Sequence, residues 1–371
     1  MKQMNKFLMI ALLASASIFT ACDDKTEDQP KPVGKYENGL FVCNEGTFGN
    51  TNGSISYYDP EKDVLTNEIF KLENNRPLGD VVQSITVSNA RYTISLNGVE
   101  KDYVHAVICV NNSNKVEIVN ALDFKEITTI EINQPRYAAI KEDKAYVTSW
   151  ADGGTVKIID LLGKKLIASI DVGNNPEAAV ITNDKLYVAN SGGSEDENTV
   201  SVVNLSTNAV STLVLDAINP TALAVDKNGD LWVLGKGSIT YDENWQPVGH
   251  RPSSLVKINT VTDETVAYLG LFAEKHPSKL AINAYGDKLY YGGGWGFQGV
   301  YAVPISSTAV PASPLIDELS YGFFVDRNTD EIFLLQEAST ANGKLIRYKA
   351  DGTKIKEYEA GIFPNGGGRK K

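Results

Sequence analysis

The chain has 371 residues, of which 46 are acidic and 35 basic, so its formal net charge at pH 7 is −11. No basic patch stands out along the sequence, which argues against nucleic-acid binding. Beyond the N-terminal segment, no apolar run is long enough to cross a membrane.

The chain opens with a predicted targeting segment. Two lysines precede Phe7–Phe19, an apolar run too short to span a bilayer as a stable helix. The run ends in Phe-Thr-Ala-Cys, which resembles the lipobox of bacterial lipoproteins with Phe19 in place of the usual leucine. We therefore predict a lipoprotein signal peptide over residues 1–21 and a diacylglycerol on Cys22. An ordinary signal peptide with a chance cysteine is the alternative.

Residues 22–37 are charged, poor in apolar residues and contain prolines, so we expect a disordered tether. Acidic residues directly after Cys22 resemble the surface-export signal of outer-membrane lipoproteins. The sequence thus favours a lipid-anchored protein exposed on the outer membrane, with a plain solvated linker as the alternative reading.

A repeated phrase dominates the rest of the chain. It runs through Pro176–Val180, Leu186–Asn190 and Thr199–Asn204, and it starts again at three other prolines. These are Pro135, Pro220 and Pro277. Units of roughly 40–50 residues with several short strands are typical of β-propeller blades. We therefore predict one all-β domain over residues 38–371, a seven-bladed β-propeller.

Seven central strands can be counted, with successive apolar residues as in strands buried on both faces. They are Leu40–Asn44, Ile108–Asn112, Ala145–Ser149, Leu186–Asn190, Leu231–Gly235, Leu289–Gly293 and Ile332–Gln336. The first unit has no proline phrase before Leu40, whereas the last carries surplus sequence through Gly361–Gly366. We predict that the C-terminal segment pairs into the first blade and closes the ring.

Two cysteines follow Cys22. In the repeat alignment, Cys43 and Cys109 are offset by an even number of positions, so both point to the same side of their own sheets. We therefore expect two buried free thiols rather than a disulfide.

In a propeller, the starts of the innermost strands and the ends of the next strands converge on one mouth of the central channel. The residues expected there are rich in amides and include aromatic side chains, which suits a large, neutral, polar ligand. The predicted mouth residues are Asn44, Asn112, Gln134, Arg136, Trp150, Glu177, Asn190, Asn219, Lys236, His276, Trp295, Tyr321 and Gln336. Trp232, by contrast, is expected in a blade core.

Enzyme motifs are weak. The chain has three histidines, and no set of them or of carboxylates converges at the predicted mouth, so we expect no metal site and no catalytic cofactor. Glu45, Glu177 and Glu337 could supply a carboxylate pair for hydrolysis. We predict a binding protein rather than an enzyme, with a lactonase-like hydrolase as a third reading.

The lipobox with its acidic tail, the phrase Asn44–Gly49 and the repeats through to the C-terminus resemble the BtuG-type surface lipoproteins. The resemblance implies a seven-bladed propeller that captures cobalamin and related corrinoids and delivers them to a TonB-dependent outer-membrane transporter. Cobalamin is wide and fringed with carboxamides, which the amide-rich mouth could bind. No protein ligand to cobalt is required, and His276 is the one candidate. A surface propeller for a glycan or a protein partner remains the alternative.

Overall fold

The computed structural model describes residues 34–96, 98–193 and 195–369. The predicted signal peptide, the lipidation site at Cys22 and most of the predicted tether lie outside these residues. Gly34–Lys371 forms one compact unit. Its packing begins before residue 38, because Tyr36 is buried and lies 4.9 Å from Tyr57, ring centre to ring centre. The end of the predicted tether therefore belongs to the folded domain.

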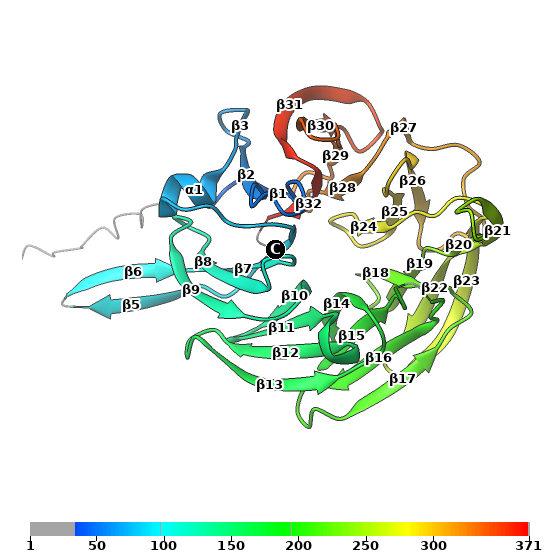
Figure 1. The fold of residues 1–371 in the computed structure, drawn as a ribbon, viewed down its shortest axis with the longest axis horizontal. Coiled ribbons are helices and arrows are strands. Elements are labelled where there is room, and N and C mark those ends of the chain that lie inside the picture. Colours follow the sequence, from blue (N-terminus) through cyan, green and yellow to red (C-terminus); the bar gives the residue numbers. More distant parts are fainter. Residues whose placement is uncertain (1–33, 97, 194, 370–371) are drawn as a thin grey trace, which may run out of the picture. The chain divides into compact units, whose positions relative to one another are not determined.

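The described residues form seven four-stranded antiparallel sheets arranged around a common axis, as Figure 1 shows. This confirms the predicted all-β, seven-bladed propeller. We number the sheets as blades 1 to 7 and give the strands of each blade from the axis outwards.

Blades 1 to 3 come from the N-terminal part of the chain and from its C-terminal strand. Blade 1 contains β32 (Pro364–Gly368), β1 (Leu40–Asn44), β2 (Ser54–Asp59) and β3 (Val64–Thr66). Blade 2 contains β4 (Val82–Val87), β7 (His105–Val110), β8 (Lys115–Asn120) and β9 (Glu126–Glu131). Blade 3 contains β10 (Pro135–Lys141), β11 (Lys144–Ser149), β12 (Thr155–Asp160) and β13 (Lys165–Asp171).

Blades 4 to 7 follow in chain order. Blade 4 contains β14 (Pro176–Thr182), β15 (Lys185–Asn190), β16 (Thr199–Asn204) and β17 (Val210–Val214). Blade 5 contains β18 (Pro220–Val225), β19 (Leu231–Gly235), β22 (Ser253–Asn259) and β23 (Glu264–Phe272). Blade 6 contains β24 (Lys279–Ile282), β25 (Lys288–Gly292), β26 (Gln298–Pro304) and β27 (Ile316–Leu319). Blade 7 contains β28 (Gly322–Val325), β29 (Ile332–Gln336), β30 (Asn342–Tyr348) and β31 (Lys354–Ile362).

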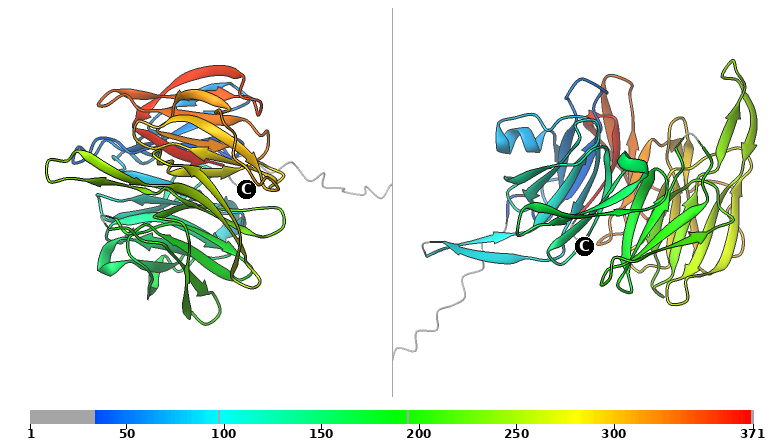
Figure 2. Two further views of the ribbon diagram at one scale, coloured as in Figure 1. Left: turned by 90° about the vertical axis from the view of Figure 1, so that its right-hand side faces the viewer. Right: turned by 60° about the horizontal axis from the view of Figure 1, so that its bottom comes forward.

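A few elements lie outside the blades. Helix α1 (Ile69–Asn74) and the 3₁₀ turn Ala151–Gly153 occupy connections. Two hairpins, β5–β6 (Tyr92–Leu96, Val99–Tyr103) and β20–β21 (Ser238–Tyr241, Pro247–Arg251), project beyond the ring, as Figure 2 shows.

The C-terminal strand closes the ring as the sequence predicts. β32 pairs antiparallel with β1, with Phe41 opposite Gly368 and Cys43 opposite Gly366. Blade 1 therefore takes its innermost strand from the end of the chain and its other strands from the beginning. The pairing covers the inner edge of β1, which would otherwise present unpaired backbone groups.

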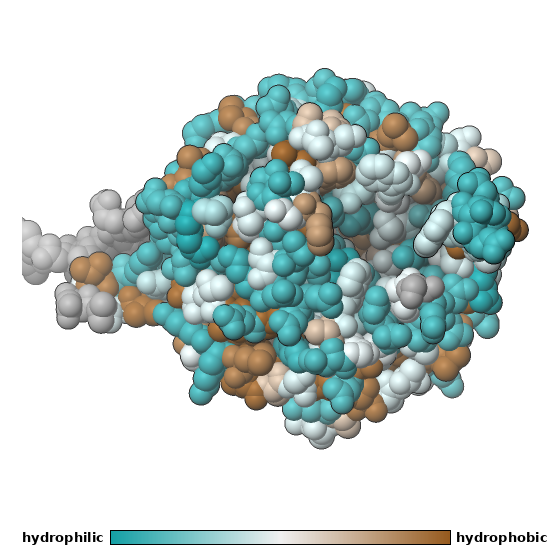
Figure 3. Space-filling view, in the orientation of Figure 1, coloured by the Kyte–Doolittle hydropathy of each residue, from teal (hydrophilic) through white to brown (hydrophobic). Residues whose placement is uncertain are grey.

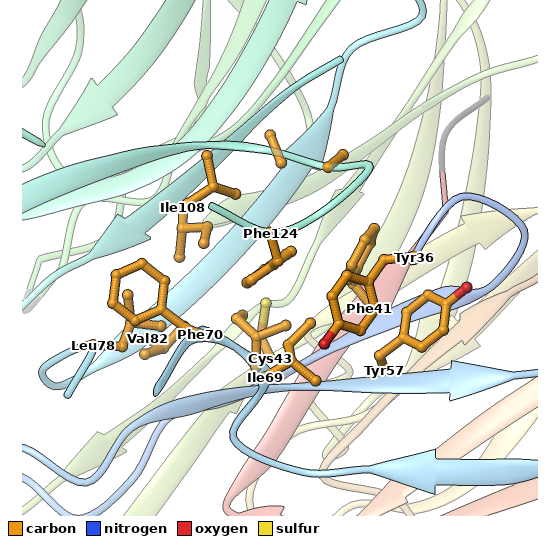
Figure 4. Packing of buried hydrophobic residues seen from close by; sticks show 14 of the residues in the cluster. Tyr36, Phe41, Cys43, Tyr57, Ile69, Phe70, Leu78, Val82, Ile108 and Phe124 are labelled. Atoms are coloured by element: carbon orange, nitrogen blue, oxygen red, sulfur yellow. The ribbon is translucent and has the colours of Figure 1, made fainter. Parts of the chain in front are cut away.

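The core is divided among seven apolar clusters in the described residues, each formed by two neighbouring blades. In blade 5, for example, every residue of β19 is buried, and Trp232 is 1% exposed, as predicted. The cluster between blades 1 and 2 packs Phe41 and Cys43 against residues such as Phe70 and Ile108 (Figure 4). Burying one large apolar side chain contributes roughly 1.5–3 kcal/mol, so blade-to-blade packing is the main stabilising term.

The two cysteines of the described domain are free and buried, as predicted. Cys43 lies in the cluster between blades 1 and 2, and Cys109 lies in the one between blades 2 and 3. Burial raises the pKa of the Cys109 thiol to about 12, and it raises that of Cys43 further. Both groups therefore behave as small apolar side chains at neutral pH.

Candidate functional site

Polar side chains from six blades converge at the end of the channel where the innermost strands begin. We call this face the mouth and the convergent group the throat. Most throat residues occupy the first, second or third position of an innermost strand or directly precede one, while Glu45 follows β1. The throat residues are Glu45, Gln83, Arg136, Tyr137, Glu177, Lys279, Tyr321 and Asn365.

An ion pair forms one side of the throat. Arg136 on β10 donates from Nη2 and Nε to the carboxylate of Glu177 on β14, at 2.9 and 3.2 Å. The two side chains are 13% and 9% exposed, so the pair is largely removed from water. Burial lowers the pKa of Arg136, but the charge and hydrogen bonds of Glu177, together with Tyr137 and Glu45, outweigh burial and leave the pKa raised. The guanidinium also donates to Oε1 of Gln83 at 2.5 Å.

The Arg136 guanidinium lies 3.9 Å from the ring centre of Trp150, which follows β11. This is a cation–π contact from an already paired cation. The Trp150 indole N–H is buried and has no hydrogen-bond partner within the described residues. The structure thus brings together three predicted site residues: Arg136, Trp150 and Glu177.

The opposite side of the throat joins the two ends of the domain. Glu45 accepts a hydrogen bond from the Tyr321 hydroxyl at 2.9 Å and another from the Asn365 amide at 2.8 Å. The Asn365 amide also donates to the carbonyl of Gln83 at 3.2 Å. Burial and then the Glu45 charge raise the pKa of Tyr321, so its hydroxyl keeps its proton at neutral pH. Ring closure therefore also builds the site.

Lys279, the first residue of β24, differs from its neighbours because its side chain has no hydrogen bond or ion pair in the part of the chain that the structure describes. Burial lowers the pKa of Lys279, but Tyr137, Glu45 and Glu177 outweigh burial and leave it raised. These three side chains come from blades 1, 3 and 4, whereas Lys279 belongs to blade 6. The ammonium group therefore stays charged at neutral pH through the influence of side chains from three other blades.

Irregular pairing at the strand starts explains why adjacent residues reach the throat. In blade 3 the register between β10 and β11 shifts between Pro135 and Ala138, so Arg136 and Tyr137 do not alternate as in a regular strand. Arg136 pairs with Glu177, and the Tyr137 hydroxyl accepts a hydrogen bond from Gln83 at 3.1 Å. The same shift occurs in blade 4 between β14 and β15.

An aromatic group lines the rim of the mouth. The Trp295 ring lies 6.4 Å from that of Tyr321 and 6.2 Å from that of Phe363, centre to centre. Trp295 is nevertheless 72% exposed, and Phe48, in the loop after β1, is 75% exposed. Exposed aromatic rings beside a polar throat offer flat surfaces on which a ligand can stack. Figure 3, which views the ring along its axis, shows mostly hydrophilic residues around a central hollow.

Three predicted mouth amides do not line the channel. Asn44 and Asn190 are fully buried, and Asn219 is 4% exposed. Asn190 donates to the hydroxyls of Thr199 and Ser201 at 2.9 and 3.0 Å, and Asn44 donates to the Ser56 hydroxyl at 2.8 Å. The Asn219 amide oxygen accepts from the Glu197 backbone N–H at 2.8 Å. These amides satisfy backbone and hydroxyl groups at the strand ends. The prediction that they face a ligand at the mouth is therefore wrong, because all three are buried inside the blades.

The other predicted residues lie at the edges of the site. Asn112 donates to Asp80 at 3.2 Å, and Gln336 donates to Glu318 at 3.2 Å. Gln134 is exposed, with a left-handed backbone φ of 44°. Both nitrogens of His276 are engaged, one with the Lys236 carbonyl at 2.9 Å and the other with His250 at 3.0 Å. Lys236 and His276 thus meet at the base of the β20–β21 hairpin.

The family assignment follows from comparison with known proteins. Residues 38–365 match DUF5074, a domain of unknown function. The chain belongs to the DUF5074 family. No curated protein matches it significantly.

Solved structures similar to this DUF5074 protein share its fold at low sequence identity. Apo AztD from Citrobacter koseri is 11% identical with a TM-score of 0.53, over 89% of this chain and 97% of that one. Dihydro-heme d1 dehydrogenase NirN in complex with DHE is 10% identical with a TM-score of 0.54, over 91% and 76%. Hydrazine synthase of Kuenenia stuttgartiensis is 15% identical with a TM-score of 0.53, over 70% and 84%. At these identities the likeness concerns the fold.

Four throat residues of this DUF5074 protein escape the sequence-based site prediction: Gln83, Tyr137, Lys279 and Asn365. Lys279 lies two residues after Pro277, and Tyr137 lies two residues after Pro135. Regular alternation along a strand directs the residue directly after the proline to the mouth, so it does not predict either of them. Gln83 and Asn365 belong to blades without the proline phrase. The sequence does predict that the C-terminal segment pairs into blade 1. Asn365 lies in this segment, at the start of β32, so the same prediction could have placed it at the mouth.

Within the described residues, no group of three or more histidine, cysteine or acidic side chains is arranged to hold a metal ion. Nor does any described helix have the length and apolar character needed to cross a membrane.

Proposed function

We propose that this DUF5074 protein is a cell-surface lipoprotein that captures cobalamin and related corrinoids at the propeller mouth. In this proposal it delivers them to a TonB-dependent outer-membrane transporter, and Cys22 carries the lipid that anchors it to the outer membrane. The resemblance of the lipobox, the Asn44–Gly49 phrase and the repeats to BtuG-type lipoproteins supports both parts.

The observation that carries the proposal is the combination of throat and rim. The throat contains two cations and two carboxylates, Arg136 and Lys279 with Glu45 and Glu177, so its formal charge is balanced. A balanced set of donors and acceptors favours a neutral polar ligand over a strongly charged one. The exposed ring of Trp295 at the rim adds a stacking surface. A corrinoid, a broad ring fringed with carboxamides, matches both features.

The engaged carboxylates support a binding role rather than catalysis. Both oxygens of Glu177 accept hydrogen bonds from Arg136, and both oxygens of Glu45 accept from Tyr321 and Asn365. A general acid or base needs to exchange a proton with the substrate, which these bonds oppose. In this proposal no protein side chain coordinates the cobalt of the corrinoid. His276, the one candidate in the sequence, has both ring nitrogens in hydrogen bonds with other residues.

The direct test mixes the purified protein with cyanocobalamin and follows the colour of the corrinoid on gel filtration, followed by calorimetric titration. Co-elution at a one-to-one ratio supports the proposal, and complete separation of colour from protein contradicts it. The exposed Trp295 would also suit a sugar ring, so a panel of oligosaccharides is titrated in parallel. Binding of a glycan without cobalamin would favour the alternative surface propeller.

The delivery step is tested in cells. A Cys22→Ala variant lacks the predicted lipid site and should lose its surface exposure, measured by protease digestion of intact cells. Corrinoid uptake at limiting concentration should fall with it. Unchanged surface exposure of this variant would contradict the lipid anchor, whatever the outcome of the binding test.

A further inference from the structure

The throat contains one cation that the protein itself does not neutralise by contact. The Lys279 side chain has no hydrogen bond or ion pair with any residue the structure describes, whereas that of Arg136 is paired with Glu177 at 2.9 Å. An ammonium group carries three donors and needs acceptors when water is partly excluded. An unoccupied set of donors at the centre of a concave site is a natural anchor for a ligand.

The acceptors near Lys279 each hold a hydrogen bond from another throat residue. The Tyr137 hydroxyl accepts from Gln83, both Glu45 oxygens accept from Tyr321 and Asn365, and both Glu177 oxygens accept from Arg136. Tyr137, Glu45 and Glu177 outweigh burial and raise the pKa of Lys279, so they favour its charged form without contacting it. The ammonium group is therefore held charged by the field of the throat while its hydrogen bonds remain available.

The position of the Lys279 side chain is constrained by its surroundings. β24 pairs with β25 so that Lys279 lies opposite Gly292. A Cβ atom built on Gly293 would stand 2.6 Å from the Lys279 Cγ and 3.4 Å from the Tyr321 carbonyl oxygen. Because Gly293 leaves this space open, the stem of Lys279 can run past β25 beside Tyr321.

We propose that Lys279 is a specificity-determining residue that binds the carbonyl oxygen of a neutral carboxamide group on the ligand. The inference rests on the proposed function and names the chemical group that enters the throat. The ammonium group donates to the amide oxygen, and the amide N–H₂ faces the remaining acceptor capacity of the Tyr137 hydroxyl and the Glu45 carboxylate. A carboxylate in the same place would add a third negative charge to a throat in which Arg136 and Lys279 already balance Glu45 and Glu177, whereas a neutral amide keeps that balance, so the throat selects the amide.

The ligand-side experiment uses the wild-type protein. Cyanocobalamin is compared by calorimetry with derivatives in each of which one peripheral carboxamide is hydrolysed to a carboxylate. We expect one derivative to bind about 10-fold more weakly or worse, because its carboxylate would enter the throat. Equal affinity for all derivatives, or tighter binding of a carboxylate derivative, would overturn the inference.

The protein-side experiment uses Lys279→Met, which removes the donors and the charge and keeps the length of the side chain. Loss of a hydrogen bond from a charged donor should weaken cyanocobalamin binding by about 10- to 100-fold. The matched control is Lys349→Met, since Lys349 is exposed between blade strands and outside the throat. In Lys279→Met the discrimination among the derivatives should also disappear. Wild-type affinity in a folded Lys279→Met protein would contradict the role of Lys279.

If the wild-type protein does not bind cyanocobalamin, the proposed function is refuted. The role of Lys279 can then still be tested by a second experiment. Acetylation of Lys279 by an amine-reactive reagent is followed by mass spectrometry in the presence of butyramide or butyrate. Stronger protection by butyramide supports the carboxamide preference for another amide-bearing ligand. Equal or stronger protection by butyrate overturns it.

Discussion

The throat and the seam between blades 1 and 7 are both charged networks that join distant parts of the chain, yet they differ in how completely their charges are paired. In the seam, Asp63 accepts hydrogen bonds from the hydroxyls of Tyr58 and Tyr358 and ion-pairs with Arg347 and Lys356, at 2.8 and 2.6 Å. Arg347 also pairs with Glu331 at 2.9 Å. Every charged member of this group has a direct partner.

The throat leaves the Lys279 side chain without such a partner in the described structure, and this residue is only partly buried. The difference indicates what each network is for. A saturated network near the edge of a blade holds two blades together, because each group has exchanged water for protein partners. A network with one unpaired cation has hydrogen-bond donors that a ligand can occupy, as a binding site requires. Variants in the two networks should therefore differ in whether they change stability or ligand binding.

The largest effect should follow deletion of residues 355–371. The deletion removes β32 and nearly all of β31, so it takes Lys356 from the seam and Asn365 from the throat. β1 loses its inner partner, and the ring opens. We expect the melting temperature to fall by about 10 °C or more. Removing the β20–β21 hairpin, which leaves all seven blades intact, is the control, and an unchanged melting curve after the 355–371 deletion would contradict ring closure.

Glu177→Gln tests the paired side of the throat. It leaves the Arg136 guanidinium, whose side chain is 13% exposed, without its carboxylate. Breaking a largely buried ion pair from one side typically costs about 3 kcal/mol, measurable by chemical denaturation. The double variant Arg136→Met/Glu177→Met should lose less than the sum of the two single changes, because neither charge is left unpaired. Strict additivity would show that the pair contributes nothing specific.

Trp295→Ala should affect binding but not folding. The ring is 72% exposed, and its centre lies more than 6 Å from those of Tyr321 and Phe363, at 6.4 and 6.2 Å, so the melting temperature should change little. Loss of a stacking surface should weaken cyanocobalamin binding by about 10-fold. Trp245→Ala is a matched control, because Trp245 is 79% exposed on the β20–β21 hairpin, away from the throat. Equal losses in the two variants would place the ligand elsewhere.

The smallest effect is expected at the seam. Hydrogen bonds from Lys356, Tyr358 and Tyr58 hold the pKa of Asp63 below its ordinary value. Since the folded-state pKa is depressed, this stabilisation is present above about pH 4 and is lost as pH falls through the folded-state pKa. Asp63 is 42% exposed, so Asp63→Asn should lower the free energy of unfolding at pH 7 by only about 1 kcal/mol. The variant should be less sensitive to acid below pH 4, and its cyanocobalamin affinity should not change.

Sequence reasoning was accurate where the signal is local. Successive apolar residues such as Leu231–Leu234 predict strands buried on both faces, and the proline phrases mark where innermost strands begin. Surplus sequence at one end and a missing strand at the other predict the pairing of β32 with β1. The burial of Trp232 and the two free thiols follow from the same alignment of repeats.

The site was predicted only in part, and the errors have a common cause. Asn44, Asn190 and Asn219 occur at strand ends that reach the mouth, but their amides bond to nearby hydroxyl and backbone groups inside the blades. Position along a strand does not reveal which way a side chain turns when buried backbone groups compete for it. Conversely, Tyr137 reaches the throat because a shift in register interrupts the alternation of β10.

The amino-acid sequence by itself determined the number of blades, their order and the way the ring closes, since each depends on repeated short-range patterns of apolar residues and turns. Only the tertiary structure decided which polar groups meet on the axis and which of them remain without a partner. Glu45 and Asn365 are 320 residues apart and Lys279 belongs to a third part of the chain, so their meeting depends on the closed ring. Hydrogen-bond satisfaction at such a convergence point is a property of the assembled blades and has no signature within any one of them.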